Sequence, residues 1–255
     1  VDLESVFTGT SYAPEALSDA EREQGDTKEQ LDLPEWIVPE LQSALGDDFE
    51  AVEAELKQRA PVVLRVNLRK TTRDIAKANL AKEGIETEAH SAATSALEVK
   101  EGAGKVRNSG AFRKGEVELQ DAASQAAIEM LPEGDLRRVL DYCAGGGGKL
   151  LAIAGRNSGS FFAHDANEQR LRDLPERCKR AGIKAKVLKT AELASAAPFD
   201  LVFCDVPCSG SGTWRRDPDA KWKIDRTSLN NSLKLQSEIL SQAARLVGDG
   251  QYLGY

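Results

Sequence analysis

The order of hydrophobic and polar positions changes at about Leu136, and this change separates two patterns. Before it, alternating runs rich in β-branched residues predict strands, and one run with helical spacing predicts a helix. The predicted strands are 61–68 (PVVLRVNL), 95–100 (SALEVK) and 115–120 (GEVELQ); the predicted helix is 71–84 (TTRDIAKANLAKEG), with apolar positions Ile75, Ala78 and Leu80, an N-cap at Thr71 or Thr72 and an end at Gly84. Residues 57–130 are therefore expected to form a small α+β unit.

After Leu136, apolar strand-like runs alternate with amphipathic helical runs. The predicted strands are 137–142 (RRVLDY), 159–165 (GSFFAHD), 184–189 (KAKVLK), 199–205 (FDLVFCD) and 250–255 (GQYLGY). The predicted helices are 149–155, 167–182 with an end at Gly182, and 228–247 with Leu229, Leu233, Leu240 and Val247 near one face. Strands alternating with helices predict a doubly wound parallel sheet over 131–255, whose ligands bind beyond the carboxyl ends of the strands.

The first 56 residues are polar and acidic, with 16 acidic and 2 basic residues, and predict a helical or flexible segment with one short helix over 33–46. The segment 57–82 that follows holds eight basic residues and one acidic residue, although the whole chain of 255 residues has a net charge of −7. Two interpretations remain open for this basic block: a surface that attracts nucleic-acid phosphate, or a solvated helix face.

Cysteine and histidine usage narrows the class of protein. The four cysteines form no C-x-x-C pair, so they indicate neither a disulfide framework nor, with two histidines, a zinc site. No apolar run approaches the roughly 20 residues that span a bilayer. We therefore expect a cytoplasmic protein without a bound metal and without a membrane partner.

The stretch DYCAGGGGKLL (141–151) places four glycines between a strand and a helix, where backbone can approach a ligand. The phosphate-binding pattern G-x-x-x-x-G-K-[ST] fails at Cys143 and Leu150, and the dinucleotide pattern G-x-G-x-x-G also fails at Leu150. The third option is S-adenosylmethionine, with Asp165 at the end of the second strand for the ribose and Asp205 at the end of the fourth near the methyl group. A methyltransferase is favoured on spacing, and a dehydrogenase stays open.

The stretch DVPCSGSGTWRRDPDAKWK (205–223) adds a thiol, Cys208, directly after a buried strand. Carbon 5 of a pyrimidine is a poor nucleophile until a thiolate adds to carbon 6, so a cysteine here suits covalent catalysis of methyl transfer. Basic residues that follow can hold phosphates. Trp214 and Trp222 can stack on bases or can belong to the core.

These motifs resemble the Sun/Fmu (RsmB-type) family of RNA cytosine-C5 methyltransferases. The family pattern D-x-C-A-A-P-G-G-K-T is similar to residues 141–150, and D-A-P-C-S-G-x-G-x-x-R-R-x-P-D-x-K-W is similar to 205–222. The resemblance implies a Rossmann-like class I methyltransferase sheet with an N-terminal α+β (RRM-like) subdomain that grips ribosomal or transfer RNA. We expect a monomer with three segments: 1–56, 57–130 and 131–255.

The resemblance also implies site residues. Binding of S-adenosylmethionine is expected at Cys143, Ala144, Gly145, Gly146, Gly147, Gly148, Lys149, Asp165, Arg170, Asp205 and Pro207. Catalytic roles are expected for Cys208 and for Asp205, which would face the cytosine. Contacts to RNA are expected from Arg65, Asn67, Arg215, Arg216 and Lys221.

Three departures from the family pattern matter. Gly145 and Gly146 stand where the family has Ala-Pro, and Leu150 stands where it has Thr. The family's attacking cysteine lies in a Y-[SA]-T-C motif, and the chain ends at the tyrosine of that motif, Tyr255. We therefore expect a chain truncated before its nucleophile, with Cys208 as the alternative nucleophile. A catalytically inactive RNA-binding protein of the same fold is the rival interpretation.

Overall fold

The computed structural model describes residues 6–10, 13–22, 31–132 and 136–255, which fall into two compact units with a boundary between residues 58 and 59. The first unit is helical. Its elements are α2 (Asp19–Arg22), η1 (Glu35–Ile37), α3 (Val38–Leu45), η2 (Gly46–Asp48) and α4 (Phe49–Leu56). The single helix predicted over 33–46 is η1 followed directly by α3, and Gly46 caps the end of α3 as predicted. Residues 23–30 of the predicted flexible segment lie outside the described residues.

The second unit contains a four-stranded antiparallel sheet in the order β2-β3-β1-β4. Its strands are β1 (Val62–Val66), β2 (Glu86–Ala89), β3 (Ala96–Glu101) and β4 (Val117–Leu119), with α5 (Arg73–Lys82), η3 (Ala103–Asn108) and α6 (Gly110–Arg113) between them. A strand–helix–strand–strand–helix–strand sequence with this order is the ferredoxin-like arrangement, which confirms the α+β prediction. Thr72 caps α5 as predicted, but the buried positions are Ala76 and Leu80, whereas Ile75 is exposed.

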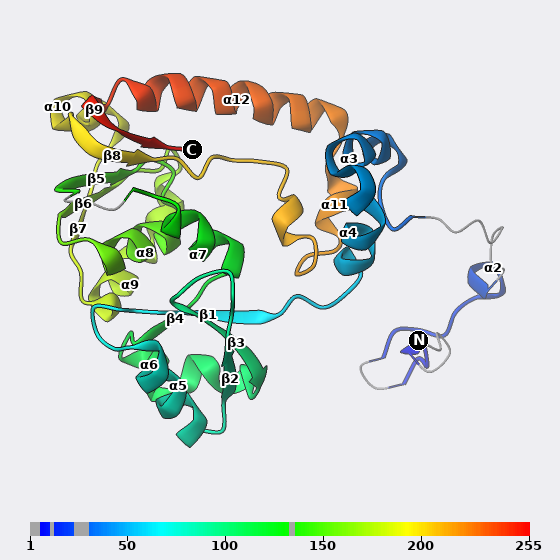
Figure 1. Cartoon of the computed structure of the whole chain (residues 1–255). Coiled ribbons are helices and arrows are strands. Elements are labelled where there is room, and N and C mark those ends of the chain that lie inside the picture. The colour runs from blue at the N-terminus through cyan, green and yellow to red at the C-terminus, as the bar shows by residue number, and fades with distance from the viewer. Residues whose placement is uncertain (1–5, 11–12, 23–30, 133–135) are drawn as a thin grey trace. The chain divides into compact units, whose positions relative to one another are not determined.

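A five-stranded parallel sheet in the order β7-β6-β5-β8-β9 forms the rest of the second unit. Its strands are β5 (Arg138–Asp141), β6 (Ser160–Ala163), β7 (Ala185–Val187), β8 (Phe199–Phe203) and β9 (Val247–Gly254). The helices are α7 (Ala122–Glu129), α8 (Gly148–Arg156), η4 (Glu168–Leu171), α9 (Leu174–Ala181), η5 (Thr190–Glu192), α10 (Leu193–Ala196), η6 (Ser211–Thr213), α11 (Ala220–Lys223) and α12 (Arg226–Ala244). In Figure 1, α8 and α9 lie on one face of this sheet and α12 on the other. The predicted Rossmann-like fold is confirmed.

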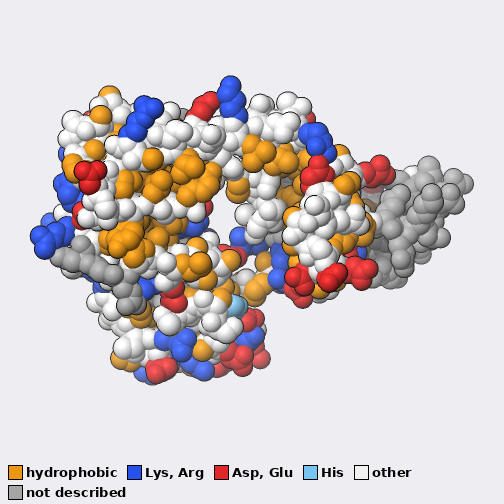
Figure 2. Space-filling model, turned by 45° about the horizontal axis from the view of Figure 1, so that its top comes forward, with side chains coloured by type: hydrophobic (Ala, Val, Ile, Leu, Met, Phe, Trp, Pro, Cys, Tyr) orange, Lys and Arg blue, Asp and Glu red, His pale blue; other side chains and the backbone are white. Residues whose placement is uncertain are grey.

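Two helix predictions need correction. The single helix expected over 167–182 is two elements, η4 and α9, because Pro175 in the first turn of α9 has no N–H to continue a helix from η4. Helix α12 buries Ile239 and Ala243, whereas Leu233 and Leu240, expected on its buried face, are exposed. Figure 2 turns the α12 side of the molecule forward and shows apolar side chains on that surface.

The loop after β1 joins the two sheets by capping helices of the parallel-sheet domain. The Arg69 guanidinium donates to the carbonyls of Ala154 (2.9 Å) and Asn157 (2.8 Å) at the end of α8. The Lys70 ammonium donates to the Arg180 carbonyl (2.6 Å) near the end of α9. Cations at helix C-termini satisfy the last carbonyls and complement the helix dipole. Two residues of the basic block, Arg69 and Lys70, therefore help to join the two sheets.

Candidate active site

The glycine loop (residues 142–147) connects β5 to α8 and needs glycine at specific positions. Gly145 and Gly147 have positive φ angles of 48° and 79°, which side chains disfavour. A Cβ atom at Gly147 would lie 2.2 Å from Leu174 Cδ1. The loop closes on itself through the Gly147 N–H, which donates to the Ala144 carbonyl at 2.7 Å. This backbone shape therefore depends on residues that carry no side chain.

Asp165 follows β6 and anchors the glycine loop from the neighbouring strand. One oxygen of its buried carboxylate accepts from the Gly145 N–H at 3.0 Å, and the other accepts from the Asn167 N–H at 3.0 Å. Arg170 Nη1 lies 3.4 Å from the same carboxylate. A carboxylate has about four acceptor positions, so Asp165 retains capacity for a ribose hydroxyl.

A cavity of about 210 Å³ opens beside the glycine loop at the carboxyl ends of the strands. Most of the predicted donor-binding residues line it, namely Cys143, Ala144, Gly145, Gly146, Gly148, Lys149, Arg170 and Asp205. Gly147, Asp165 and Pro207 do not. At its edge, Lys149 Nζ from α8 lies 2.5 Å from Asp205 Oδ2, although these residues are 56 positions apart in the chain. The structure thus brings the two sequence motifs together.

Asp141 and Gln120 also line this cavity, and sequence reasoning missed both. Asp141 is 1% exposed, and in the described part of the chain neither of its carboxylate oxygens has a hydrogen-bond partner. Burial raises the pKa of Asp141 to about 7; the charge of Asp205 adds to this rise, and the charge of Lys149 and the nearby Leu150 N–H oppose it. An unpartnered buried carboxylate beside a cavity fits a cationic ligand, and S-adenosylmethionine carries an ammonium and a sulfonium group. The available sequence signal was an aspartate at the strand end, directly before the loop.

The four cysteines, all within the described residues, differ in accessibility. Cys208 is exposed, Cys143 is half-buried, and Cys178 and Cys204 are buried. Burial raises the pKa of both Cys143 and Cys204 to about 12, so these thiols stay protonated and are poor nucleophiles. Cys208 belongs to the thiol loop (residues 204–210), which follows β8. A hydrogen bond ties this loop to α12, from Gln236 Nε2 to the Pro207 carbonyl at 2.8 Å.

Two of the predicted RNA contacts line a second, larger cleft. Arg215 and Arg216 lie there with Arg59 around a volume of about 610 Å³, and Gln120 lines both this cleft and the first cavity. Arg216 pairs with Asp121. Lys221, by contrast, is only 1% exposed and does not line the cleft.

The aromatic side chains of this segment divide between core and surface. Trp214 is buried, and Trp222 is 54% exposed. Of the two, Trp222 alone is therefore positioned to offer a ring to a nucleic-acid base at the surface.

The expected RNA contacts of Arg65 and Asn67 are corrected by the structure, because both side chains are buried and bonded within the protein. Arg65 Nη1 donates to the Gly148 carbonyl (2.7 Å) and to Gln120 Oε1 (2.5 Å). The Asn67 amide donates to the Gly115 carbonyl (3.0 Å) and, at the end of α9, to the Ala181 carbonyl (2.9 Å). Burial lowers the pKa of Arg65 to about 10. These two residues join the sheets and do not face solvent.

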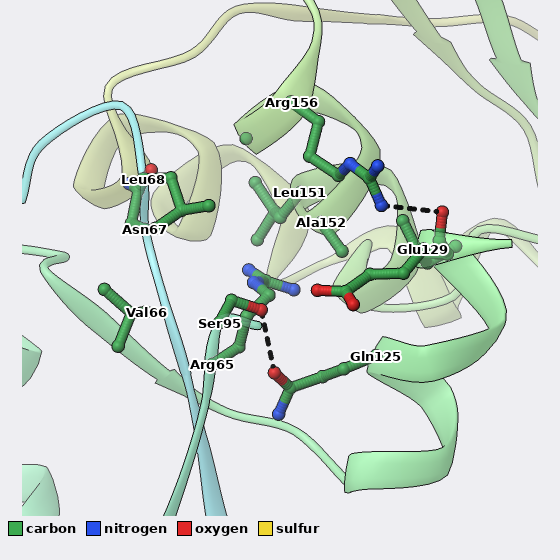
Figure 3. A pocket seen from close by; sticks show the side chains of 12 residues that line it. Arg65, Val66, Asn67, Leu68, Ser95, Gln125, Glu129, Leu151, Ala152 and Arg156 are labelled. Atoms are coloured by element: carbon green, nitrogen blue, oxygen red, sulfur yellow. Dashed lines mark hydrogen bonds between the residues drawn. The ribbon is translucent and has the colours of Figure 1, made fainter. Parts of the chain in front are cut away.

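Figure 3 shows the side chains around Arg65. Its side chain lies beside a small cavity of about 20 Å³, together with Ser95, Gln125 and Glu129. The Ser95 hydroxyl donates to Gln125 Oε1 at 3.0 Å, which closes one side of this space. Such a volume holds about one water molecule and excludes a nucleic acid.

Among the described residues, no group of three or more histidine, cysteine, aspartate or glutamate side chains is arranged to hold a metal ion. Within the same ranges, no helix has the length and apolar character needed to cross a membrane.

Comparison with known proteins agrees with this geometry. A family model described as 16S rRNA methyltransferase RsmB/F matches residues 128–255, and an RsmF/B-like ferredoxin-like domain model matches residues 33–106. The ribosomal RNA small subunit methyltransferase B of Enterobacter sp. (strain 638) is 36% identical over 215 residues, covering 81% of this chain and 50% of that protein. The chain thus spans about half the length of the curated relatives it matches.

Two solved structures share the fold. NSun6 from Pyrococcus horikoshii with SFG has a TM-score of 0.73 at 16% identity and covers 88% of this chain and 82% of its own. A methyltransferase homologue from Pyrococcus horikoshii has a TM-score of 0.67 at 22% identity and covers 87% and 76%. The family match confirms the expected cofactor, S-adenosylmethionine. The ferredoxin-like sheet, the parallel sheet and the matched models agree that the chain belongs to the RsmB/F family of 16S rRNA methyltransferases.

Proposed function

We propose that the chain carries the donor-binding part of an enzyme that transfers a methyl group to carbon 5 of a cytosine in ribosomal RNA. One observation carries this proposal. Asp205, paired with Lys149 at the cavity edge, lies three residues before the exposed thiol of Cys208. A donor cavity, an ionic pair and an accessible cysteine at one edge of the sheet suit methyl transfer to a pyrimidine.

Binding of the methyl donor is assigned to the glycine loop and two buried carboxylates. S-adenosylmethionine supplies an electrophilic methyl group. We propose that Asp141 accepts from the ammonium group of the donor, because this carboxylate is buried without a described partner. Asp165, already ordered by the Gly145 N–H, is assigned to the ribose hydroxyls.

The target base is assigned to the space beyond Asp205. A carboxylate there can accept a hydrogen bond from the exocyclic amine of cytosine, which uracil lacks. A thiolate adds to carbon 6 of the base, and the displaced electron pair lets carbon 5 attack the methyl group, whose bond to the donor sulfur breaks so that S-adenosylhomocysteine leaves. A base then removes the carbon 5 proton, the electron pair restores the double bond, and the thiolate leaves. The family resemblance gives attack to a cysteine of a Thr-Cys motif and assists release through Cys208.

The cleft lined by Arg59, Arg215 and Arg216 is proposed to hold the RNA backbone beside the target base. Guanidinium groups suit phosphate because they donate two parallel hydrogen bonds. Gln120, shared by the cleft and the donor cavity, places this surface next to the donor. Cytoplasmic location and a monomeric state are part of the same proposal.

Cys208→Ala, made in a protein that also carries the family's Thr-Cys motif, tests the mechanism. Incubation with S-adenosylmethionine and labelled small-subunit ribosomal RNA should accumulate a covalent protein–RNA adduct on a denaturing gel, because attack survives and release fails. Ser211→Ala, an exposed change beside the thiol loop, should leave the adduct absent. If methylation stops and no adduct forms, Cys208 is itself the nucleophile.

Mass spectrometry of the RNA product tests the target atom. The wild-type enzyme should produce 5-methylcytidine, and a methylated product without it would contradict the cytosine-C5 assignment. The rival interpretation, an inactive RNA-binding protein, predicts a silent calorimetric titration with S-adenosylmethionine.

A further inference from the structure

Two arginines hold the backbone carbonyls at the turn into α8. Arg177 Nη1, from α9, donates to the Gly146 carbonyl at 2.6 Å. Arg65 Nη1, from β1, donates to the Gly148 carbonyl at 2.7 Å. Four consecutive glycines have no side chains to restrict their own backbone, so external bonds must define their conformation. The two arginines provide such bonds from different elements.

Both arginines are held by β4 and the residue that follows it in the ferredoxin-like sheet. Glu118 Oε2 lies 3.6 Å from Arg177 Nε and 2.7 Å from Arg180 Nη2. Gln120 Oε1 accepts from Arg65 at 2.5 Å. Because Glu118 and Gln120 are two residues apart along an extended segment, their side chains leave it on the same side. One side of β4 thus supports both contacts to the glycines.

The Arg177 guanidinium also occupies the space beside Gly146. A Cβ atom built at Gly146 would lie 2.8 Å from Arg177 Nη1. Neither Arg177 nor Arg65 lines the donor cavity, whereas Gly146 and Gly148 both do. The arginines therefore act on the cavity through the groups that they hold, which are the two glycine carbonyls and, for Arg65, the Gln120 side chain.

We propose that Arg177 and Arg65 are positioning residues that set the glycine conformation for the methyl donor, and that β4 thereby couples the ferredoxin-like sheet to donor affinity. The inference rests on S-adenosylmethionine as the donor. It assigns to the small sheet a second role besides any contact with RNA, because its Glu118 and Gln120 orient the groups that shape the donor cavity.

Calorimetric titration of the full chain with S-adenosylmethionine tests the proposal. Arg177→Gln should raise the Kd about tenfold, since a hydrogen bond from a charged donor is lost. Arg177→Lys, which can still donate to the Gly146 carbonyl, should recover part of the affinity. Arg180→Gln is the matched control, because Arg180 pairs with the same Glu118 but no contact joins it to the glycine loop among the described residues. It should lower the melting temperature without changing the Kd.

Gly146→Ala sharpens the test, because it should change the Kd for S-adenosylmethionine in opposite directions in two backgrounds. In the wild type, the new Cβ pushes the guanidinium away from the loop, so the Kd should rise. In the Arg177→Gln background that clash is relieved, and alanine restricts the loop, so the Kd should fall. The same direction of change in both backgrounds would overturn the proposal.

Two further outcomes separate this inference from the proposed function. A Kd for Arg177→Gln equal to that of the wild type, in a variant that melts cooperatively, would overturn the positioning role and leave methyl transfer intact. A wild-type chain that does not bind S-adenosylmethionine would contradict both.

Discussion

The glycine loop and the thiol loop follow neighbouring strands of one sheet, yet they are built in opposite ways. In the glycine loop, the N–H groups of Ala144, Gly145 and Gly147 are all bonded, and Arg177 holds a carbonyl. In the thiol loop, Asp205, Pro207 and Cys208 are exposed, and the bond from Gln236 to the Pro207 carbonyl is its tie to α12.

This difference matches the two tasks that we propose for these loops. A loop that binds the same donor in every cycle benefits from a backbone fixed in advance, because less freedom is lost on binding. A loop whose thiol must meet a nucleotide benefits from exposure, because the base has to approach it. The donor side therefore has a defined shape without RNA, and the reacting side is left accessible to it.

The largest expected effect is on the rate of methyl transfer, and it comes from a change in the thiol loop. Asp205→Asn keeps the shape of the side chain but removes the charge beside Lys149, so methyl transfer should slow by about 10²–10³-fold. Single-turnover methylation of RNA by the full-length enzyme measures this rate. The free energy of unfolding should change by less than about 1 kcal/mol, because the Asp205 side chain is 53% exposed.

The control for this change is Asp249→Asn, at an exposed aspartate of β9, which should leave both properties unchanged. If the Asp205 variant reacted at the wild-type rate, the carboxylate would have no part in the reaction. The contrast between the loops would then reduce to a difference in exposure.

The next largest effect is on stability, and it compares one glycine of the glycine loop with one glycine of the thiol loop. Gly147→Ala should lower the free energy of unfolding by about 2–4 kcal/mol, because a positive φ is combined with a clash against Leu174. Gly210→Ala, with φ of 74° but its nearest contact at 3.6 Å, should cost about 1–2 kcal/mol. Gly155→Ala, in open space within α8, should stabilise by about 0.5–1 kcal/mol.

Urea denaturation of the three variants measures these differences. Equal losses for Gly147→Ala and Gly210→Ala would mean that the two loops are equally constrained.

The last expected effect is a pH dependence of the free energy of unfolding, caused by Asp141 directly before the glycine loop. The pKa of Asp141 is about 7 in the folded chain and about 3.9 when unfolded. Its contribution to stability is therefore complete below about pH 4 and is lost as pH rises through 7. Between about pH 5.5 and 8.5 the free energy of unfolding should fall by about 1–2 kcal/mol.

Asp141→Asn should abolish that dependence, as measured by urea denaturation over a pH series. Saturating S-adenosylmethionine should oppose the loss in the wild type, because a cationic ligand favours the ionised carboxylate. A wild-type profile that coincides with that of Asp141→Asn would show that Asp141 does not titrate in this range.

Much of the architecture follows from local sequence. The strands at 160–163 and 199–203 are short apolar runs, and Asp165 and Asp205 come two residues after the end of each, so their common edge was predictable. The burial of α12 was not predictable from its helical period. Leu233 and Leu240 share a face with neighbouring apolar residues, but only packing against the sheet selects Ile239 and Ala243 for the core.

Periodicity and turn residues were enough to predict the parallel sheet and the exposed place of Cys208 after a buried strand, and the resemblance of two motifs was enough to predict the family. What the buried polar groups do depends on contacts that form only when distant parts of the chain fold together. The acceptor of Arg65 lies 83 residues further along the chain, and that of Asn67 at Ala181 lies 114 residues away. A basic or amide side chain has the same local appearance whether it faces phosphate or a distant carbonyl, and only folding brings that carbonyl within hydrogen-bond reach.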